Sequence, residues 1–302
     1  MNIMFMGTSD FAVAALCALS ENNLKPNIVI SQPDKPRNRG IVTPTPVKAK
    51  ALELGIDVLT PDKIKNGEFS DTLKKYNPEI IVVVAYGKIL PKYILDFPKL
   101  GCINIHASLL PKYRGSAPIN FAIINGEKET GVTTMFMDEG IDTGDMIFTE
   151  KTQISETDNV ETLHDRMAQM GGNLIVKTLR ALQEGTAPRI KQDGESSYAP
   201  MIDNQTRKID FSCDSKKIVD IIRGLCPVPT AFSTFEGKNV KIYDAIQADT
   251  NINAEPGQIC DNKKLIVKTG NGAIEILSLQ PESKKRMSGE DFLRGHKSGR
   301  FE

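Results

Sequence analysis

The chain has 302 residues, a length that favours two modest domains over a single core. Its 38 basic and 38 acidic side chains cancel, which excludes a protein dominated by one sign of charge. Five separated cysteines without a C-x-x-C pair argue against a disulfide framework or a zinc site, so we expect no metal. The longest apolar run, Ile80 to Tyr86, is far below the ~20 residues of a membrane span, and we predict a cytoplasmic protein without a membrane partner.

Short apolar runs alternate with helical patterns through the first half of the chain. We predict strands at residues 2–7, 26–32, 57–60, 79–87, 101–108 and 131–137, and helices at 11–23, 47–56 and 69–77. Such alternation predicts an α/β fold with a doubly wound, mostly parallel sheet. In these sheets the functional site lies beyond the carboxyl ends of the strands.

The second half begins with the longest helical pattern, Val160 to Gly185, which ends on a glycine suited to a helix terminus. A polar stretch interrupted by proline and glycine follows, and then a predicted helix at 216–225. Five short β-like runs at 229–237, 238–248, 257–262, 264–270 and 272–281 predict a small C-terminal β-barrel. We therefore predict a catalytic domain at 1–189, a linker at 190–206 and a second domain at 207–302.

The strand CINIH carries polar residues on one face only. Alternation along a strand places Cys102, Asn104 and His106 on one face, with Ile103 and Ile105 on the other. An asparagine amide can stabilise an oxyanion and an imidazole can move protons near neutral pH, so the pair suits acyl transfer. Two residues form a weak motif, and a purely structural role for both is an equally good interpretation of the spacing alone.

Cys102 shares this face and must be considered as a nucleophile. On an extended strand its Cα lies about 13 Å from that of His106, at ~3.3 Å per residue, beyond hydrogen-bond reach. We therefore predict that Cys102 packs in the core.

A carboxylate is needed to orient the imidazole, and the segment MFMDEGIDTGD is the richest source. It holds Asp138, Glu139, Asp142 and Asp145 after a predicted strand. Its glycines permit a tight loop in which one aspartate could turn inward. Spacing alone does not choose which one, and a solvated turn is the alternative.

Two motifs together resemble the signature of the folate-dependent formyltransferases. They are NIHASLLPKYRGSAPI at 104–119 and DEGIDTGD at 138–145. These enzymes move a formyl group from 10-formyltetrahydrofolate to an amine. The resemblance implies that Asn104, His106 and Asp142 are catalytic. It also implies a folate-binding loop made of Ser108, Leu109, Leu110 and Pro111.

Further motifs extend the resemblance over nearly the whole chain, to the members of the family that act on methionyl-tRNA. They are MGTSDFA, SQPDKPRNRG, AYGKILP, YAPMI and KKRMSGEDFLRG, in this order. The resemblance implies a Rossmann-like catalytic domain, an OB-fold-like C-terminal domain, methionyl initiator tRNA as the formyl acceptor and a monomer. Candidate tRNA contacts are Lys35, Arg37 and Arg39 in one loop and Lys284, Lys285 and Arg286 near the C-terminus.

Two rival functions remain open. A formyltransferase acting on a nucleotide-linked amino sugar would share the catalytic signature and a similar length. A non-catalytic RNA-binding module would use the β-barrel alone. The basic C-terminal motif argues against the first, and the presence of Asn104, His106 and Asp142 argues against the second.

Overall fold

The computed structural model describes residues 1–37, 41–249 and 253–302. The chain forms two compact units. The first contains residues 1–115, 130–152 and 164–198, and the second contains residues 116–129, 153–163 and 199–302. The predicted division into 1–189, 190–206 and 207–302 stays a prediction about functional domains.

A seven-stranded sheet forms the centre of the first unit, in the order β10-β9-β7-β6-β1-β2-β5. The strands are β1 (Ile3–Gly7), β2 (Ile28–Ile30), β5 (Val58–Leu59), β6 (Ile80–Val84), β7 (Cys102–His106), β9 (Glu129–Phe136) and β10 (Met146–Gln153). Strands β5, β2, β1, β6 and β7 pair in parallel, and β9 is antiparallel to β7. The predicted doubly wound, mostly parallel sheet is confirmed.

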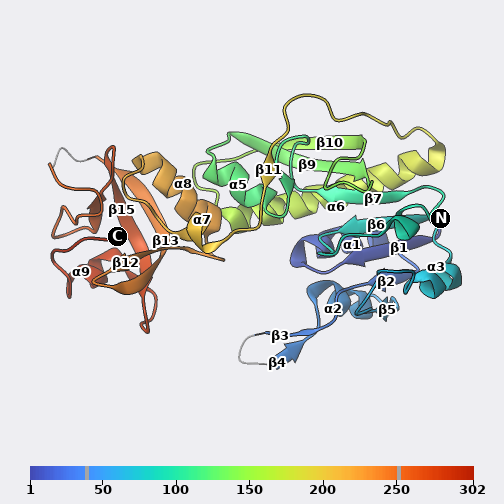
Figure 1. Cartoon of the computed structure of the whole chain (residues 1–302), viewed down its shortest axis with the longest axis horizontal. Helices are drawn as coiled ribbons and strands as arrows, with labels where there is room; N and C mark the ends of the chain where they lie inside the picture. Colours follow the sequence, from blue (N-terminus) through green and yellow to red (C-terminus); the bar gives the residue numbers. More distant parts are fainter. Residues whose placement is uncertain (38–40, 250–252) are drawn as a thin grey trace. The chain divides into compact units, whose positions relative to one another are not determined.

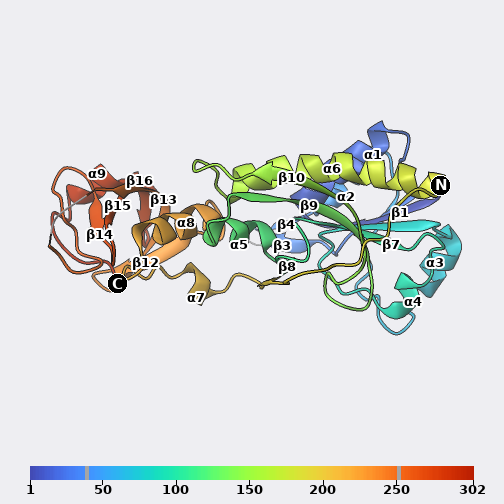
Figure 2. The same ribbon diagram turned by 90° about the horizontal axis from the view of Figure 1, so that it is seen from above.

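The central strands are apolar on both faces because helices cover both. Every residue of β1 and β6 is buried, which explains why their sequences read as continuous apolar runs. Figure 2 shows α1 (Asp10–Glu21) and α6 (Val160–Glu184) on one side of the sheet and α3 (Ser70–Tyr76) and α4 (Lys92–Leu95) on the other.

Local sequence explains where these helices begin, end and pack. Thr45 caps α2 (Pro46–Glu53) by accepting a hydrogen bond from the Lys48 backbone. Gly185 follows α6 with φ of +69°, as predicted for a terminating glycine. Within α6, a Cβ on Gly172 would lie 3.0 Å from the Ala14 carbonyl oxygen, so a glycine lets α6 approach α1 closely.

The second unit is built on an antiparallel half-barrel, drawn in orange and red in Figure 1. Its strands are β12 (Ala231–Phe235), β13 (Lys238–Ala248), β14 (Ile266–Lys268), β15 (Ala273–Pro281) and β16 (Met287–Ser288). Its helices are α5 (Pro118–Ile124), α7 (Asn204–Arg207), α8 (Ser215–Leu225) and α9 (Gly289–Leu293). Helices α5 and α8 meet where a Cβ on Gly224 would lie 2.7 Å from the Ile124 side chain. The predicted C-terminal β-domain is confirmed.

Several segments differ from the sequence-based expectation. The segment with Lys35 and Arg37, which the sequence suggested is a loop, forms an antiparallel hairpin of β3 (Lys35–Arg37) and β4 (Ile41–Thr43). Its ladder forms in spite of Pro36, because a proline at a two-stranded edge removes only one donor. Residues 257–262 make isolated bridges in place of the predicted strand. Strand β10 was not predicted, because residues 146–153 mix apolar, charged and polar side chains.

Within the described residues, helix length and hydropathy give no candidate for a membrane-spanning helix. The same residues contain no cluster of three or more His, Cys, Asp or Glu side chains placed to hold a metal ion.

Candidate active site

Strand β7 ends at the edge of the sheet where ligands bind in this class of fold. The chain runs from β1 outward to β2 and β5, and then returns to the other side of β1 with β6 and β7. This reversal places the topological switch between β1 and β6, with the carboxyl end of β7 beside it. His106 is the last residue of β7 and pairs with Thr133 on β9.

The His106 ring lies between two oxygen acceptors. Its Nε2 is 2.8 Å from the Tyr113 carbonyl oxygen, and its Nδ1 is 3.5 Å from the Asp142 carboxylate. A carbonyl only accepts, so Nε2 carries a proton in this arrangement. A second proton on Nδ1 makes the ring an imidazolium that donates toward both partners. His106 is 5% exposed, so these contacts are shielded from water.

Asp142 is the aspartate that turns inward from the loop between β9 and β10. Its Oδ2 accepts a hydrogen bond of 2.8 Å from the Gly115 backbone in addition to facing His106. Its φ of +54° lies in the left-handed region, which is uncommon for a residue with a Cβ. The other three carboxylates pair elsewhere: Asp138 with Gly140 and Thr143, Glu139 with Lys92, and Asp145 with Arg189. Of the four carboxylates in this loop, Asp142 is therefore the one that faces His106.

Asn104 lies two positions before His106 on the same strand. Its side chain is half-buried, and within the described part of the chain its amide has no hydrogen-bond partner. An amide that is held by a strand and still available is a suitable donor to an oxyanion.

The turn after β7 brings the predicted folate-binding loop against the sheet. Ser108 is buried, and its hydroxyl donates to the Lys112 carbonyl over 2.6 Å. Thr133 on β9 donates to the Ser108 carbonyl over 2.7 Å, which anchors the turn. Leu110 is buried, and the half-buried Leu109 and Pro111 side chains give the turn an apolar lining.

Three contacts at this site were not predicted as functional. Tyr113 supplies its carbonyl to His106, Gly115 supplies its amide to Asp142, and Gln192 holds the Asp142 backbone. Tyr113 and Gly115 lie within the motif that carried the resemblance, so their position was a usable signal. Gln192 lies in a polar stretch whose composition indicated only a linker.

Cys102 is a core residue, as predicted. It is 2% exposed, and burial, assisted by Asp96, raises the pKa of its thiol to about 12. Its Sγ lies 3.7 Å from the Ile94 carbonyl oxygen. A thiol of this kind is inert near neutral pH.

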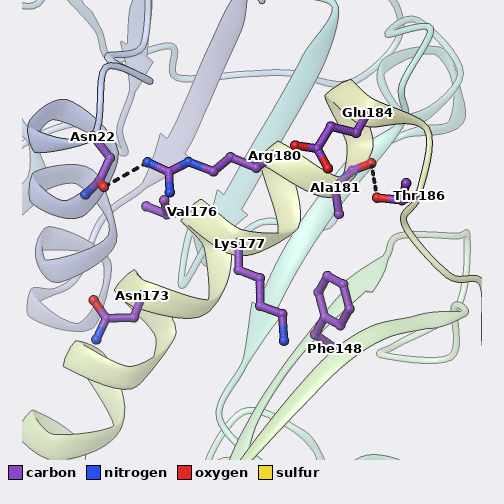
Figure 3. Close-up of a pocket in the computed structure, with 9 residues that line it drawn as sticks. All are labelled: Asn22, Phe148, Asn173, Val176, Lys177, Arg180, Ala181, Glu184 and Thr186. Atoms are coloured by element: carbon purple, nitrogen blue, oxygen red, sulfur yellow. Dashed lines mark hydrogen bonds between the residues drawn. The ribbon is translucent and has the colours of Figure 1, made fainter.

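A hollow of about 530 Å³ lies elsewhere in the first unit, along α6. Figure 3 shows its cationic side chains engaged by protein groups: Arg180 donates to Asn22 over 3.1 Å, and Lys177 lies 4.4 Å from the centre of the Phe148 ring. The nine residues that line it include no histidine or cysteine. Its chemistry is that of an open polar surface, so we place the active site at β7.

The candidate tRNA contacts lie on two different elements. Lys35 is exposed on β3, Arg37 ends that strand, and Arg39 falls outside the described residues. Lys284, Lys285 and Arg286 are exposed in the turn between β15 and β16. Arg286 also stacks 4.3 Å from the centre of the Tyr243 ring and donates to Ser278 over 2.6 Å. Of the three, Arg286 therefore also has a packing role.

Comparison with known proteins gives the class to which this site belongs. Residues 1–179 match the family model described as formyl transferase, and residues 201–297 match the formyl transferase C-terminal domain. The chain belongs to the formyl transferase family, which confirms the resemblance found in its motifs.

Two relatives match over almost the whole chain. The methionyl-tRNA formyltransferase of Caldanaerobacter subterraneus subsp. tengcongensis is 48% identical over 300 residues, which cover 98% of this chain and 97% of that protein. The methionyl-tRNA formyltransferase of Pelotomaculum thermopropionicum is 48% identical over 299 residues, which cover 98% of this chain and 96% of that protein.

Solved structures with the same fold are more distant in sequence. The sugar 3N-formyl transferase WlaRD, solved with dTDP and 5-N-formyl-THF, has a TM-score of 0.69 at 23% identity and covers 94% of this chain and 99% of its own. HypX from Aquifex aeolicus in complex with tetrahydrofolic acid has a TM-score of 0.65 at 17% identity. The match covers 97% of this chain but only 47% of HypX.

Proposed function

We propose that the protein transfers the formyl group of 10-formyltetrahydrofolate to the amino group of methionyl initiator tRNA, for translation initiation. Asn104, His106 and Asp142 lie together at the carboxyl edge of the sheet in a member of the formyl transferase family, and this arrangement is the observation that carries the proposal. The relatives at 48% identity support methionyl-tRNA as the acceptor. A cytoplasmic location belongs to the same proposal.

The chain's own residues have distinct tasks in this reaction. The Asn104 amide donates a hydrogen bond to the oxygen of the formyl group as negative charge develops there. The protonated His106 ring adds a positive charge on the same face of β7, and Asp142 orients it. A single oxyanion donor contributes about 10²–10³-fold to the rate, which is the size of effect we expect for the Asn104 amide. A monomeric state belongs to the same proposal.

The turn after β7 fits the folate donor. Ser108, Leu109, Leu110 and Pro111 would hold it: the Leu109 and Pro111 side chains suit a flat ring, and backbone groups of the turn suit its polar edge. When bound, 10-formyltetrahydrofolate supplies an activated formyl group whose carbonyl carbon bonds to the amine nitrogen while its bond to N10 breaks. The amine loses a proton as the leaving nitrogen gains one, so the charges balance. The His106 ring, whose two nitrogens face Tyr113 and Asp142, stays protonated and contributes its positive charge.

A product analysis tests this function. The purified protein is incubated with 10-formyltetrahydrofolate and either methionyl initiator tRNA or a dTDP-linked amino sugar, and the products are identified by mass spectrometry. We expect formylmethionine after mild alkaline release from the tRNA, and no formylated sugar. Formylation of the sugar without formylation of the tRNA would overturn the proposal.

A further inference from the structure

The segment from Ile190 to Tyr198 lies against both turns that contact the His106 ring. Its composition predicted a linker, yet it belongs to the first compact unit. Ile190 exchanges backbone hydrogen bonds with Met146 at the start of β10, and Ser197 accepts one from the Arg114 backbone. The segment therefore spans from the loop of Asp142 to the loop of Tyr113.

Gln192 uses its whole amide group in this position. Its Nε2 donates to the carbonyl oxygens of Asp142 over 2.8 Å and Gly144 over 2.9 Å. Its Oε1 accepts from Arg114 at Nε over 3.1 Å and at Nη2 over 2.7 Å. Both donors and the acceptor are in use. Residue 191 and residues 193–196 are exposed, whereas Gln192 is half-buried, so its inward position is specific to that side chain.

Ser197 makes the equivalent contact to the second turn. Its hydroxyl accepts a hydrogen bond of 2.9 Å from the Tyr113 backbone. Tyr113 has a φ of +59°, and Asp142 has a φ of +54°, so both residues that contact His106 are held in the left-handed region. A bulky residue occupies that region only where its surroundings enforce it.

We propose that residues 190–198 form a positioning strap, in which Gln192 and Ser197 hold the Asp142 and Tyr113 turns in the geometry that orients His106. The role of this strap in turnover rests on the proposed function. Gln192 and Ser197 touch no reacting atom, so they act through Asp142 and Tyr113.

An amide is required at position 192 because the site needs one acceptor and two donors. Gln192→Glu keeps the acceptor for Arg114 but places a carboxylate oxygen against the Asp142 and Gly144 carbonyl oxygens. All of these atoms are acceptors, so no hydrogen bond forms there. Gln192→Ala removes every contact. Gln183→Glu is the matched control, because Gln183 is exposed on α6 and the substitution adds the same charge in the same unit.

The first readout needs no substrate. The Gly115 amide donates to Asp142, so its hydrogen exchange, measured by NMR on the free protein, reports how well that carboxylate is held. We expect exchange to be about 10-fold faster in Gln192→Ala and Gln192→Glu and unchanged in Gln183→Glu. In Ser197→Ala we expect the same increase at the Tyr113 amide. This readout remains informative if the wild-type protein does not formylate methionyl-tRNA, which would count against the proposed function alone.

The second readout is a double-mutant cycle on formylation. Gln192→Ala and Gln192→Glu should lower kcat by about 10–100-fold with less than about twofold change in KM for either substrate. Added to Asp142→Ala, Gln192→Ala should cause no further loss beyond about twofold, because it acts through Asp142. Unchanged amide exchange in both Gln192 and Ser197 variants, or fully additive losses in the cycle, would overturn the strap. If Gln192→Ala does not fold, Ser197→Ala and Gln192→Glu carry the same test.

Discussion

His106 is oriented by two residues whose backbone has an uncommon conformation. The Tyr113 carbonyl and the Asp142 carboxylate face its two nitrogens, and both residues have positive φ. A ring held from both sides cannot flip without losing one partner. The strain stored in these two turns is therefore part of how the site is built.

Cys102 shares a strand face with His106 but should have no chemical role. Because burial raises the pKa of its thiol to about 12, iodoacetamide at pH 8 should leave it unmodified in the native protein. The half-buried Cys17, Cys213 and Cys260 should react first. Peptide mapping by mass spectrometry measures this, with the protein in urea as the positive control for Cys102. A formyl-cysteine adduct at Cys102 in the presence of the formyl donor would contradict the assignment.

Tyr86 should lower stability through its hydroxyl. Within the described residues its buried hydroxyl oxygen has no hydrogen-bond partner, and burial raises its pKa from 10.0 to about 12. Tyr86→Phe should therefore raise the free energy of unfolding by about 1 kcal/mol near pH 7. Urea unfolding of both proteins measures this.

The pH dependence of Tyr86 follows from the same burial. Burial favours the neutral phenol in the folded protein, so the unfolded chain ionises first. The stability of the folded state therefore does not depend on this group below pH 10 and falls further as pH rises from 10 toward 12. Tyr86→Phe should remove this part of the alkaline loss of stability. An equal fall in the free energy of unfolding for both proteins between these pH values would show that the hydroxyl is solvated in the folded state.

At the scale of elements, continuous apolar runs and clear periodicity made prediction reliable. Strands β1 and β6 and helix α6 follow from their patterns alone. A strand buried on both faces has a continuous apolar sequence, and a helix buried along one face has regularly spaced apolar residues. Strand β10 and helix α5 were missed. The first has one buried and several exposed positions without strict alternation, and the second is only seven residues long.

The candidate site was predictable only in part. Alternation along β7 placed Asn104 and His106 on one face without any structure. Asp142 followed from family resemblance, because four carboxylates lie in one loop and only tertiary contacts separate them. Gln192 could not be predicted, since its role depends on the Asp142 and Gly144 carbonyl groups, which lie 50 and 48 residues earlier in the sequence.

The β3–β4 hairpin should bind the tRNA backbone. Lys35 is exposed on β3, and Arg37 is the last residue of that strand. Replacing both with glutamine should raise KM for tRNA, leave folate affinity unchanged and lower the slope of log affinity against log salt by about 1 per lost phosphate contact. Filter binding of tRNA between low and moderate salt measures the slope. An unchanged slope would show that this hairpin is merely solvated.

At the scale of the whole molecule, neutral net charge conceals an asymmetry. The 16 basic against 13 acidic side chains of residues 206–302 contrast with 22 against 25 in residues 1–205. We expect the basic excess of residues 206–302 to contact the phosphates of a polyanionic substrate. Such contacts fix the position of the substrate without reading its sequence.

The turn between β15 and β16 allows the expected phosphate contacts of the C-terminal part to be tested. Lys284 and Lys285 are exposed and can be neutralised without disturbing the Arg286 contacts to Tyr243 and Ser278. Replacing both lysines with glutamine should weaken tRNA binding and reduce its salt dependence, with unfolding stability within about 0.5 kcal/mol of wild type. Binding isotherms at several salt concentrations measure this. Full retention of affinity and slope would remove the C-terminal turn from the tRNA interface.

The most direct measurement is the single-turnover rate of formyl transfer to methionyl initiator tRNA with both substrates saturating, in wild type and in Asn104→Ala, His106→Ala and Asp142→Ala. Saturation separates the chemical step from binding. Asn173→Ala, an exposed asparagine on α6, is the control. Each of the three variants should be slower by at least about 10²-fold with tRNA affinity little changed, whereas the control should match wild type. Near wild-type transfer in any of the three would contradict the assignment of that residue, and in all three would show that the transfer does not occur at the end of β7.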